Sequence, residues 1–361
     1  MQSCDFPDTE AKLRYLESIL AEGVPTLGVR RLETHMSWIL LGADKVLKLK
    51  KPVRYAFLDF STVQAREHDG REEVRLNRRL APRVYLGLLA LVWDGETFEL
   101  LPEDRVGTRD RVVDWLVAME RLPAHRMLDQ LIASHELRPA DIDALLEMLV
   151  SFYRHAPRAC ITEDDYLARL RAELAGNREV LAQPRFQLGV ATLLDRMDGA
   201  IAEHEALLRK RVRDGRIVDG HGDLRPEHVC LVDPPVVIDA LEFDARLREV
   251  DAFDELCFLA LECRIAGDAA IGPRLIKGCA EALSDEPPAA LLRFHTARRA
   301  LLRARLSMAH LLEPNVRNPG EWTPQAVRYL EEASEALRST DASLSSFGAS
   351  MPTFAANPLH A

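Results

Sequence analysis

Four side chains able to do chemistry lie close together in the stretch VDGHGDLRPEHVCL, residues 218–231. They are His221, Asp223, Arg225 and His228, and they follow an apolar run typical of a short strand. An aspartate in such a loop can accept a proton from a hydroxyl, and histidine with aspartate can bind a first-row metal ion. Three interpretations remain open for this stretch: phosphoryl transfer, metal-assisted hydrolysis, or a polar turn capped by aspartate.

A further carboxylate, Asp239, follows Asp223 by 16 residues at the end of the apolar run PVVID. Nearer the N-terminus, Lys48 lies in the run KVLKLK, and Glu73 follows it by 25 residues. A lysine between apolar neighbours on a strand is most often exposed, so this strand alone favours an exposed Lys48. The alternative is a lysine whose charge faces a cleft.

Short strands and one helix must position the lysine and the glutamate. Apolar spacing predicts a helix over 9–21 and a second over 62–80. Strands are predicted at 37–41 and 45–50 around a turn at 42–44, around an Asp94-Gly95 hairpin, and within 110–123. Both Glu72 and Glu73 lie near the apolar stripe of the second helix, so the periodicity leaves open which of them faces Lys48.

The remainder of the chain is predicted to be mostly helical. Apolar stripes mark helices over 139–156, 164–182, 186–212, 291–312 and 324–339. A strand-rich break at 215–244 carries the polar loop. The pattern predicts an α+β fold with a small sheet-plus-helix lobe over 1–118 and a larger helical lobe over 119–340. The polar, aperiodic residues 341–361 are expected to form a loose tail.

Composition favours a cytoplasmic globular protein. The net charge of −10 argues against general nucleic-acid binding, which depends on neutralising phosphates. The longest apolar runs, such as YLGLLALVW, fall well short of the roughly 20 residues that span a bilayer, so no membrane association is expected. Six scattered cysteines form no Cys-x-x-Cys pair, which argues against a zinc ribbon or a dithiol redox motif.

The segment HGDLRPEH resembles the His-Arg-Asp-Leu-Lys-Pro-Glu-Asn catalytic loop of protein kinases. Its His-Gly-Asp form is similar to that of the aminoglycoside phosphotransferase and choline kinase superfamily. Asp239 stands where that resemblance places the metal-binding aspartate, and Lys48 and Glu73 follow the order of the phosphate-binding lysine and its glutamate. The resemblance implies a bilobal protein-kinase-like fold and transfer of the ATP γ-phosphoryl to a hydroxyl of a small-molecule acceptor.

The same resemblance implies a role for each matching residue. Asp223 would accept the proton of the attacking hydroxyl, and Arg225 would contact the γ-phosphoryl group. Lys48 would bind the α- and β-phosphates, held by Glu73 or Glu72, and Asp239 would bind Mg²⁺. The turn ending at Ser37 would cover the nucleotide, residues 115–120 would form the adenine hinge, and Asp251 and Asp254 would support the catalytic loop.

Residues 25–310 also look like an uncharacterised bacterial group within this superfamily, some of whose members carry a fused C-terminal ATP-binding domain. The sequence has no Gly-x-x-x-x-Gly-Lys-Ser/Thr motif, so a stand-alone version is expected. The acceptor, the choice between ATP and GTP, and the oligomeric state do not follow from the sequence.

His228 departs from the kinase pattern, because the resemblance places an asparagine there as a second metal ligand. Imidazole suits softer first-row metals better than Mg²⁺, so one metal held by Asp239 alone, a preference for Mn²⁺, or a pseudokinase that only binds nucleotide are alternatives. A bond from His228 to Asp223 or the loop backbone is another. The hydrolase interpretation, built on His221, Asp223, His228 and Asp239, leaves Lys48 and Glu73 without a role.

Overall fold

The computed structural model describes residues 7–22, 28–55, 58–313 and 316–338. The tail predicted over 341–361 lies outside these residues. Contacts divide the chain into two compact units. The first unit combines the chain up to Leu167 with Ala206–Pro287. The second unit combines Ala168–Glu205 with the chain from Pro288 onward.

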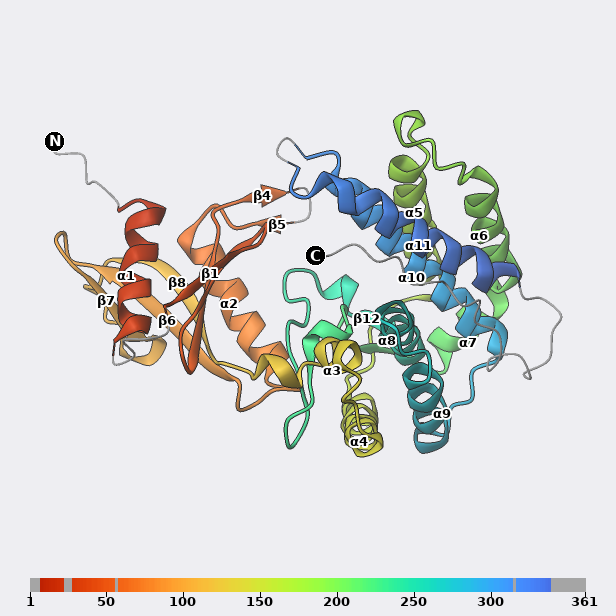
Figure 1. Cartoon of the computed structure of the whole chain (residues 1–361), viewed down its shortest axis with the longest axis horizontal. Coiled ribbons are helices and arrows are strands. Elements are labelled where there is room, and N and C mark those ends of the chain that lie inside the picture. The colour runs from red at the N-terminus through yellow and green to blue at the C-terminus, as the bar shows by residue number, and fades with distance from the viewer. Residues whose placement is uncertain (1–6, 23–27, 56–57, 314–315, 339–361) are drawn as a thin grey trace, which may run out of the picture. The chain divides into compact units, whose positions relative to one another are not determined.

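The first unit begins with a six-stranded antiparallel sheet in the order β1-β2-β3-β8-β6-β7 (Figure 1). Its strands are β1 (Arg30–Glu33), β2 (Ser37–Leu41), β3 (Lys45–Lys50), β6 (Tyr85–Trp93), β7 (Phe98–Pro102) and β8 (Val112–Glu120). Helix α1 (Thr9–Ala21), the small hairpin β4 (Arg54–Tyr55) and β5 (Leu58–Asp59), and helix α2 (Val63–Asn77) complete this part. These bounds confirm the predicted strands at 37–41 and 45–50 and the helix at 9–21.

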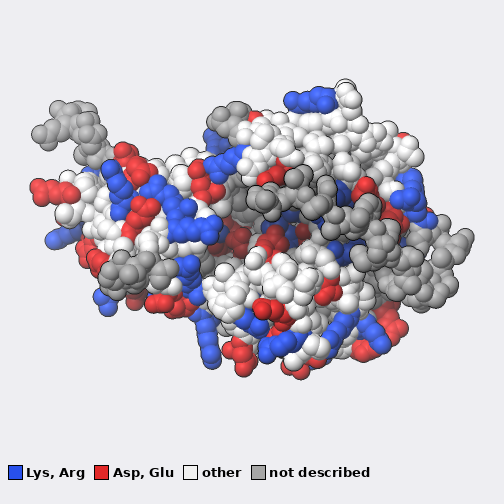
Figure 2. Space-filling view, viewed as in Figure 1, with Lys and Arg blue, Asp and Glu red and all other residues white. Residues whose placement is uncertain are grey.

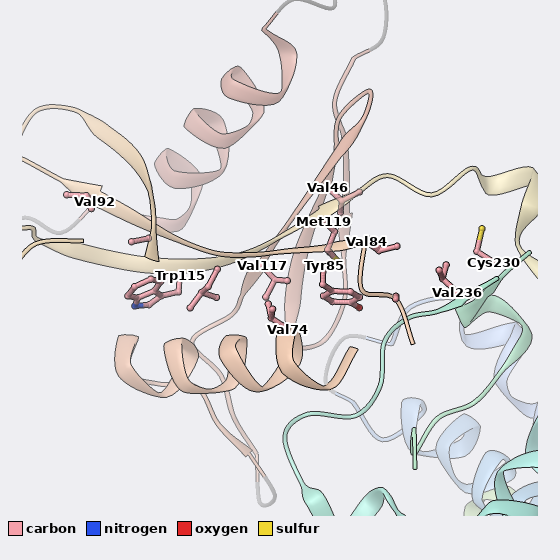
Figure 3. Packing of buried hydrophobic residues seen from close by; sticks show 13 residues of the cluster. Val46, Val74, Val84, Tyr85, Val92, Trp115, Val117, Met119, Cys230 and Val236 are labelled. Carbon is pink, nitrogen blue, oxygen red and sulfur yellow. The ribbon is translucent and has the colours of Figure 1, made fainter. Parts of the chain in front are cut away.

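Alternating side chains give the sheet two apolar faces. Leu47 and Leu49 of β3 pack with Leu13 and Leu16 of α1 on one face. On the other face Val74 of α2 joins an apolar cluster with β6 and β8 residues, as Figure 3 shows. Helix α2 therefore lies against the face of the sheet opposite to α1.

Lys48 faces α2. Its neighbours Val46 and Val117 belong to the cluster on that face, and Lys48 pairs with Val117 in the register between β3 and β8. Its side chain is 13% exposed. The exposed position that the strand alone favoured is therefore wrong, because the carboxylates that stabilise this lysine come from distant parts of the chain.

The rest of the first unit is mainly helical, with short strands around the polar loop. Its helices are α3 (Leu128–Ser134), α4 (Pro139–His155), the start of α5 (Glu163–Leu181), α7 (Glu205–Arg213), α8 (Ala252–Ala266) and α9 (Ile271–Leu283). Its strands are β9 (Ile217–Asp219), β10 (Val229–Cys230), β11 (Val236–Val237) and β12 (Glu249–Asp251). Strand β9 pairs with β12, and β10 pairs with β11, so the predicted strand-rich break is confirmed.

The second unit is helical. It contains most of α5, α6 (Ala191–Glu203), α10 (Ala289–His310) and α11 (Pro319–Arg338). The continuous helix predicted over 186–212 is wrong: Gln187 adopts a left-handed conformation, and α6 ends before α7 begins at Glu205. The salt bridge from Arg298 to Glu173, at 2.8 Å, links α10 with α5 within this unit.

On the face seen in Figure 2, Lys and Arg side chains lie among Asp and Glu side chains, and the face also has extended areas without charged residues. Arg211, in the basic stretch of α7, is buried and bonded to Asp251 and Asp285 at 2.6 Å each. Among the described residues, no helix has the length and apolar character needed to span a membrane.

Candidate active site

The His-Gly-Asp loop is anchored by a buried carboxylate. Glu255 of α8 is fully buried and accepts hydrogen bonds from the backbone N–H groups of His221, at 2.9 Å, and of Gly222. Gly222 has a φ of +91°, which favours glycine, and a side chain there would meet Leu241. A Cβ at Gly220 would lie 2.5 Å from the Glu255 carboxylate. Glycine at both positions therefore lets the loop close over Glu255.

His221 is a structural member of the loop. Its Nε2 donates to the carbonyl of Ile238 at 2.9 Å, and its Nδ1 accepts from the N–H of Asp223 at 3.2 Å. These two bonds require the neutral ring. Burial, with a smaller contribution from the neighbouring His228, lowers the pKa of His221 to about 4. The ring thus ties the loop to the strand that precedes Asp239.

Asp223 and Arg225 form an ion pair at the mouth of the loop. The Asp223 Oδ2 lies 2.9 Å from Arg225 Nη2, and Arg225 also pairs with Glu227. The Nε of Arg225 is buried without a hydrogen-bond partner. A carboxylate with a neighbouring guanidinium can accept a proton and stabilise an adjacent negative charge, which is the chemistry predicted for this loop.

Lys48 lies between two carboxylates. Its Nζ lies 2.8 Å from Glu73 Oε1 and 3.0 Å from Asp239 Oδ1. Burial opposes the charge of Lys48, but Asp239 and Glu73 outweigh it and raise the pKa of Lys48 well above its ordinary value. Glu72 pairs with Arg75 instead, at 2.7 Å. The structure thereby selects Glu73 as the partner of Lys48.

The backbone of Asp239 is held by side chains of the N-terminal lobe. Asp239 has a φ of +65°, which a residue other than glycine adopts at a cost of about 1 kcal/mol or more. Its N–H donates to the hydroxyl of Tyr85 at 3.1 Å, and the N–H of Ala240 donates to Asn77 at 2.9 Å. The Lys48 ammonium lowers the pKa of Asp239 below its usual range, so the carboxyl is ionised.

His228 lies between the loop at Asp223 and the segment at Asp239. Its Nδ1 lies 2.8 Å from the carbonyl of Asp223, so Nδ1 carries the proton that this bond needs. In the neutral ring Nε2 then accepts from Arg225 Nη2 at 3.3 Å, and it lies 3.7 Å from Asp239 Oδ2. A backbone bond at one ring nitrogen that orients the other is typical of histidine metal ligands. Asp239 and His228 are close enough to bind one divalent cation if that cation replaces the bond from Arg225 to Nε2.

The hydrolase interpretation does not fit the ring of His221, because both of its nitrogens already bind within the protein. The support predicted from Asp251 and Asp254 stays a prediction, and the adjacent Glu255 bonds the loop backbone. Asp251 caps α8 by accepting from the N–H of Phe253 at 3.0 Å and binds Arg211. The segment DAFDE correctly indicated where the helix begins. In the first turn of that helix, Glu255 is the residue that faces the loop.

Ser37 and the expected hinge lie at the edges of this site. Ser37 begins β2 directly opposite Lys50, and its backbone N–H and carbonyl bond to Thr34 within the β1–β2 turn. Residues 115–120 are part of β8, where Met119 lies opposite Val46 in the β3 register. Both residues belong to the apolar cluster of Figure 3, which also includes Cys230 from the loop region.

Comparison with solved structures identifies the class of fold. A choline/ethanolamine kinase family protein from Mesorhizobium loti superposes with a TM-score of 0.51 over 90% of this chain and 98% of its own, at 13% identity. A choline kinase from Cryptosporidium parvum gives a TM-score of 0.51 over 92% of this chain and 97% of its own, at 10% identity. The chain has the fold of these kinases, which confirms the bilobal α+β fold predicted from the sequence.

Sequence comparison finds more similar relatives. Uncharacterised proteins of Mycobacterium tuberculosis and Mycobacterium bovis are 30% identical to this chain over 320 residues. The match covers 87% of this chain and 60% of each relative, so the chain spans about three fifths of the length of these relatives. No family model matches the chain.

Proposed function

We propose that this chain is an ATP-dependent phosphotransferase that moves the γ-phosphoryl group to a hydroxyl of a small molecule. The observation that supports this most directly is the Lys48–Glu73–Asp239 cluster, with a lysine held between two carboxylates from separate elements. Asp223 belongs to the same site, because His228 lies 3.7 Å from a carboxylate oxygen of both Asp223 and Asp239. This arrangement supplies the charges that phosphoryl transfer requires.

Each side chain has a distinct part in the proposal. Asp223 takes the proton of the attacking hydroxyl, and Arg225 stabilises charge on the transferred group. Lys48 binds the α- and β-phosphates, and Glu73 fixes its position. Ser37, in the β1–β2 turn, covers the phosphates. The adenine lies against the end of β8, between a lobe of residues 1–118 and a helical lobe of 119–340.

Asp239 and His228 would hold the divalent cation, Mg²⁺ or Mn²⁺, which would neutralise charge on the phosphates. Replacing Asp239 with alanine should abolish metal-dependent stabilisation by nucleotide. Ligand at about 100 times its Kd adds about 2.7 kcal/mol to the free energy of unfolding, which corresponds to several degrees in Tm. The measurement is thermal unfolding with ATP and Mg²⁺, ATP and Mn²⁺, or ATP and a chelator.

The matched control for this measurement is Asp143→Ala, which removes an exposed carboxylate on α4 whose partner is Arg274. It should keep the full nucleotide shift. A wild-type protein that gains no stability from ATP under any metal condition would contradict the proposed function.

His228→Asn should move the metal preference toward Mg²⁺. An amide oxygen suits Mg²⁺, whereas the Nε2 lone pair of His228 suits a softer cation such as Mn²⁺. We expect wild-type protein to bind ATP with a lower Kd in the presence of Mn²⁺ than of Mg²⁺. His228→Asn should change the ratio of these two Kd values by about tenfold in favour of Mg²⁺. Calorimetric titration with a non-hydrolysable ATP analogue measures it. If the ratio of the Kd values with Mn²⁺ and Mg²⁺ were the same in both proteins, His228 would serve only to bond the loop backbone.

His228 also favours a second candidate function, a pseudokinase that binds nucleotide without transfer. Its Nδ1 bond to the Asp223 carbonyl shows that the ring serves the loop structure, where kinases place a metal-binding asparagine. Nucleotide binding by the wild-type protein without any acceptor-dependent transfer would support this candidate over the first.

A further inference from the structure

Lys50 is a second lysine on the same strand face as Lys48. Side chains two residues apart on β3 point to the same side of the sheet, toward α2. Lys50 is 3% exposed, far more deeply buried than a lysine usually is. Its Nζ also lies 5.3 Å from the centre of the Phe60 ring. A lysine at such depth needs partners for its charge.

Three carboxylates surround the Lys50 ammonium. Its Nζ lies 2.6 Å from an oxygen of each of Asp69, Glu73 and Glu242. These three side chains approach one another closely enough to hold a metal ion. Lys50 already supplies the positive charge at their centre. The cluster is therefore an internal ion network that joins β3, α2 and the segment after Asp239.

Glu73 is shared between the two lysines. Its Oε1 binds Lys48 at 2.8 Å and its Oε2 binds Lys50 at 2.6 Å. Two cations at the two oxygens fix both the place of the carboxylate and its rotation. Burial alone would raise the pKa of Glu73, but Lys48 and Lys50 lower it below the ordinary value. Without Lys50, one oxygen of this buried carboxylate would lose its partner.

Glu242 links Lys50 to the segment that carries Asp239. It lies three residues beyond Asp239, and its side chain is 8% exposed. The backbone N–H groups at 239 and 240 bond to Tyr85 and Asn77, and Lys48 binds the Asp239 carboxylate, so Lys50 is a fourth side chain from the sheet-and-α2 part that holds this short segment. Burial raises the pKa of Glu242 to about 7, and Lys50 opposes that rise.

We infer that Lys50 is a positioning residue, which holds Glu73 and the segment 239–242 so that Lys48 and Asp239 keep their mutual geometry. This inference rests on the proposed function for its consequence, namely tighter binding of metal and nucleotide. The positioning role itself depends only on contacts that are present in the ligand-free protein. A positively charged side chain at position 50 is needed because three buried carboxylates meet there.

The test compares Lys50→Met with Lys45→Met, which removes an exposed lysine of the same strand whose partner is Glu120. In ligand-free protein, Lys50→Met should speed amide hydrogen exchange at Asp239 and Ala240 by about tenfold, and Lys45→Met should leave it within about twofold of wild type. Calorimetry with a non-hydrolysable ATP analogue and Mn²⁺ should show about tenfold weaker binding for Lys50→Met alone.

Lys50→Met leaves buried carboxylates without a counter-charge, so the charge-balanced pair Lys50→Met with Glu242→Gln serves as a second variant if the single one does not fold. The backbone amide hydrogens of residues 239 and 240 should also exchange faster in this double variant than in the wild-type protein. Unchanged exchange at both amides in the folded variants overturns the inference, whatever the nucleotide result. If wild-type protein fails to bind nucleotide while exchange rises as expected, the proposed function fails and the positioning role stands.

Discussion

Asp223→Asn should lower phosphoryl transfer by about 10²- to 10⁴-fold while leaving ATP affinity within about twofold of wild type. Asparagine has nearly the shape of aspartate, so its side-chain oxygen can still accept from Arg225, which lies 2.9 Å from the Asp223 carboxylate. It cannot take the proton of an attacking hydroxyl. The loss should therefore fall on kcat, because the ground-state contacts of the nucleotide are retained.

The measurement for Asp223→Asn is transfer of label from γ-labelled ATP to a panel of small hydroxyl compounds, followed by rate constants on whichever acceptor the wild-type protein uses. Glu227→Gln is the matched control. It neutralises another carboxylate that binds Arg225. Glu227 has no role in taking the proton of the attacking hydroxyl. Equal rates for wild type and Asp223→Asn would remove Asp223 from the role of base. Transfer by neither protein, with ATP bound by both, would favour the pseudokinase.

The resemblance to kinase motifs selected Lys48 and Asp239 as members of one site, and the structure places Lys48 Nζ 3.0 Å from Asp239 Oδ1. The sequence could not choose between Glu72 and Glu73, which are adjacent on one helix. The choice depends on how α2 is rotated against the sheet, and that rotation buries Glu73 completely while Glu72 stays beside Arg75 at the surface. Packing of Val74 against the sheet sets the rotation.

Other members of the site left only weak signals in the sequence. Lys50 is visible in hindsight as the second lysine of an alternating strand, but alternation alone also fits an exposed edge. Tyr85 and Asn77 bind the backbone at residues 239 and 240, more than 150 residues away along the chain. Contacts of such sequence separation depend on tertiary structure, and no local pattern in the sequence encodes them.

The support of the catalytic loop shows the same limit at closer range. The sequence predicted that Asp251 and Asp254 would support the loop, and the residue that bonds its backbone is their neighbour Glu255. The choice of side chain depended on one residue of helical register, since Glu255 follows Asp254 directly. Gly220 offered a clue, because a residue with no side chain leaves room for a close neighbour. A Cβ there would lie 2.5 Å from Glu255.

Glu255→Ala should lower the free energy of unfolding by about 3–5 kcal/mol and reduce transfer by about 100-fold or more in whatever protein remains folded. The change leaves the buried N–H groups of His221 and Gly222 without an acceptor, and the Tyr153 hydroxyl loses a 3.0 Å bond. Loss of these bonds frees the loop that carries Asp223, and small displacements of a catalytic group are costly.

Glu255→Gln separates the charge of this residue from its hydrogen bonds. Its amide oxygen can keep the position of Oε1, which accepts from both backbone N–H groups, and its amide nitrogen can donate to the Tyr153 hydroxyl. Denaturant unfolding should therefore show a loss for Glu255→Gln that is less than half of the loss for Glu255→Ala. If both variants lost the same free energy of unfolding, the negative charge of Glu255 would matter, rather than its set of bonds to the loop. If Glu255→Ala lost less than about 1 kcal/mol, the loop would be held by other residues.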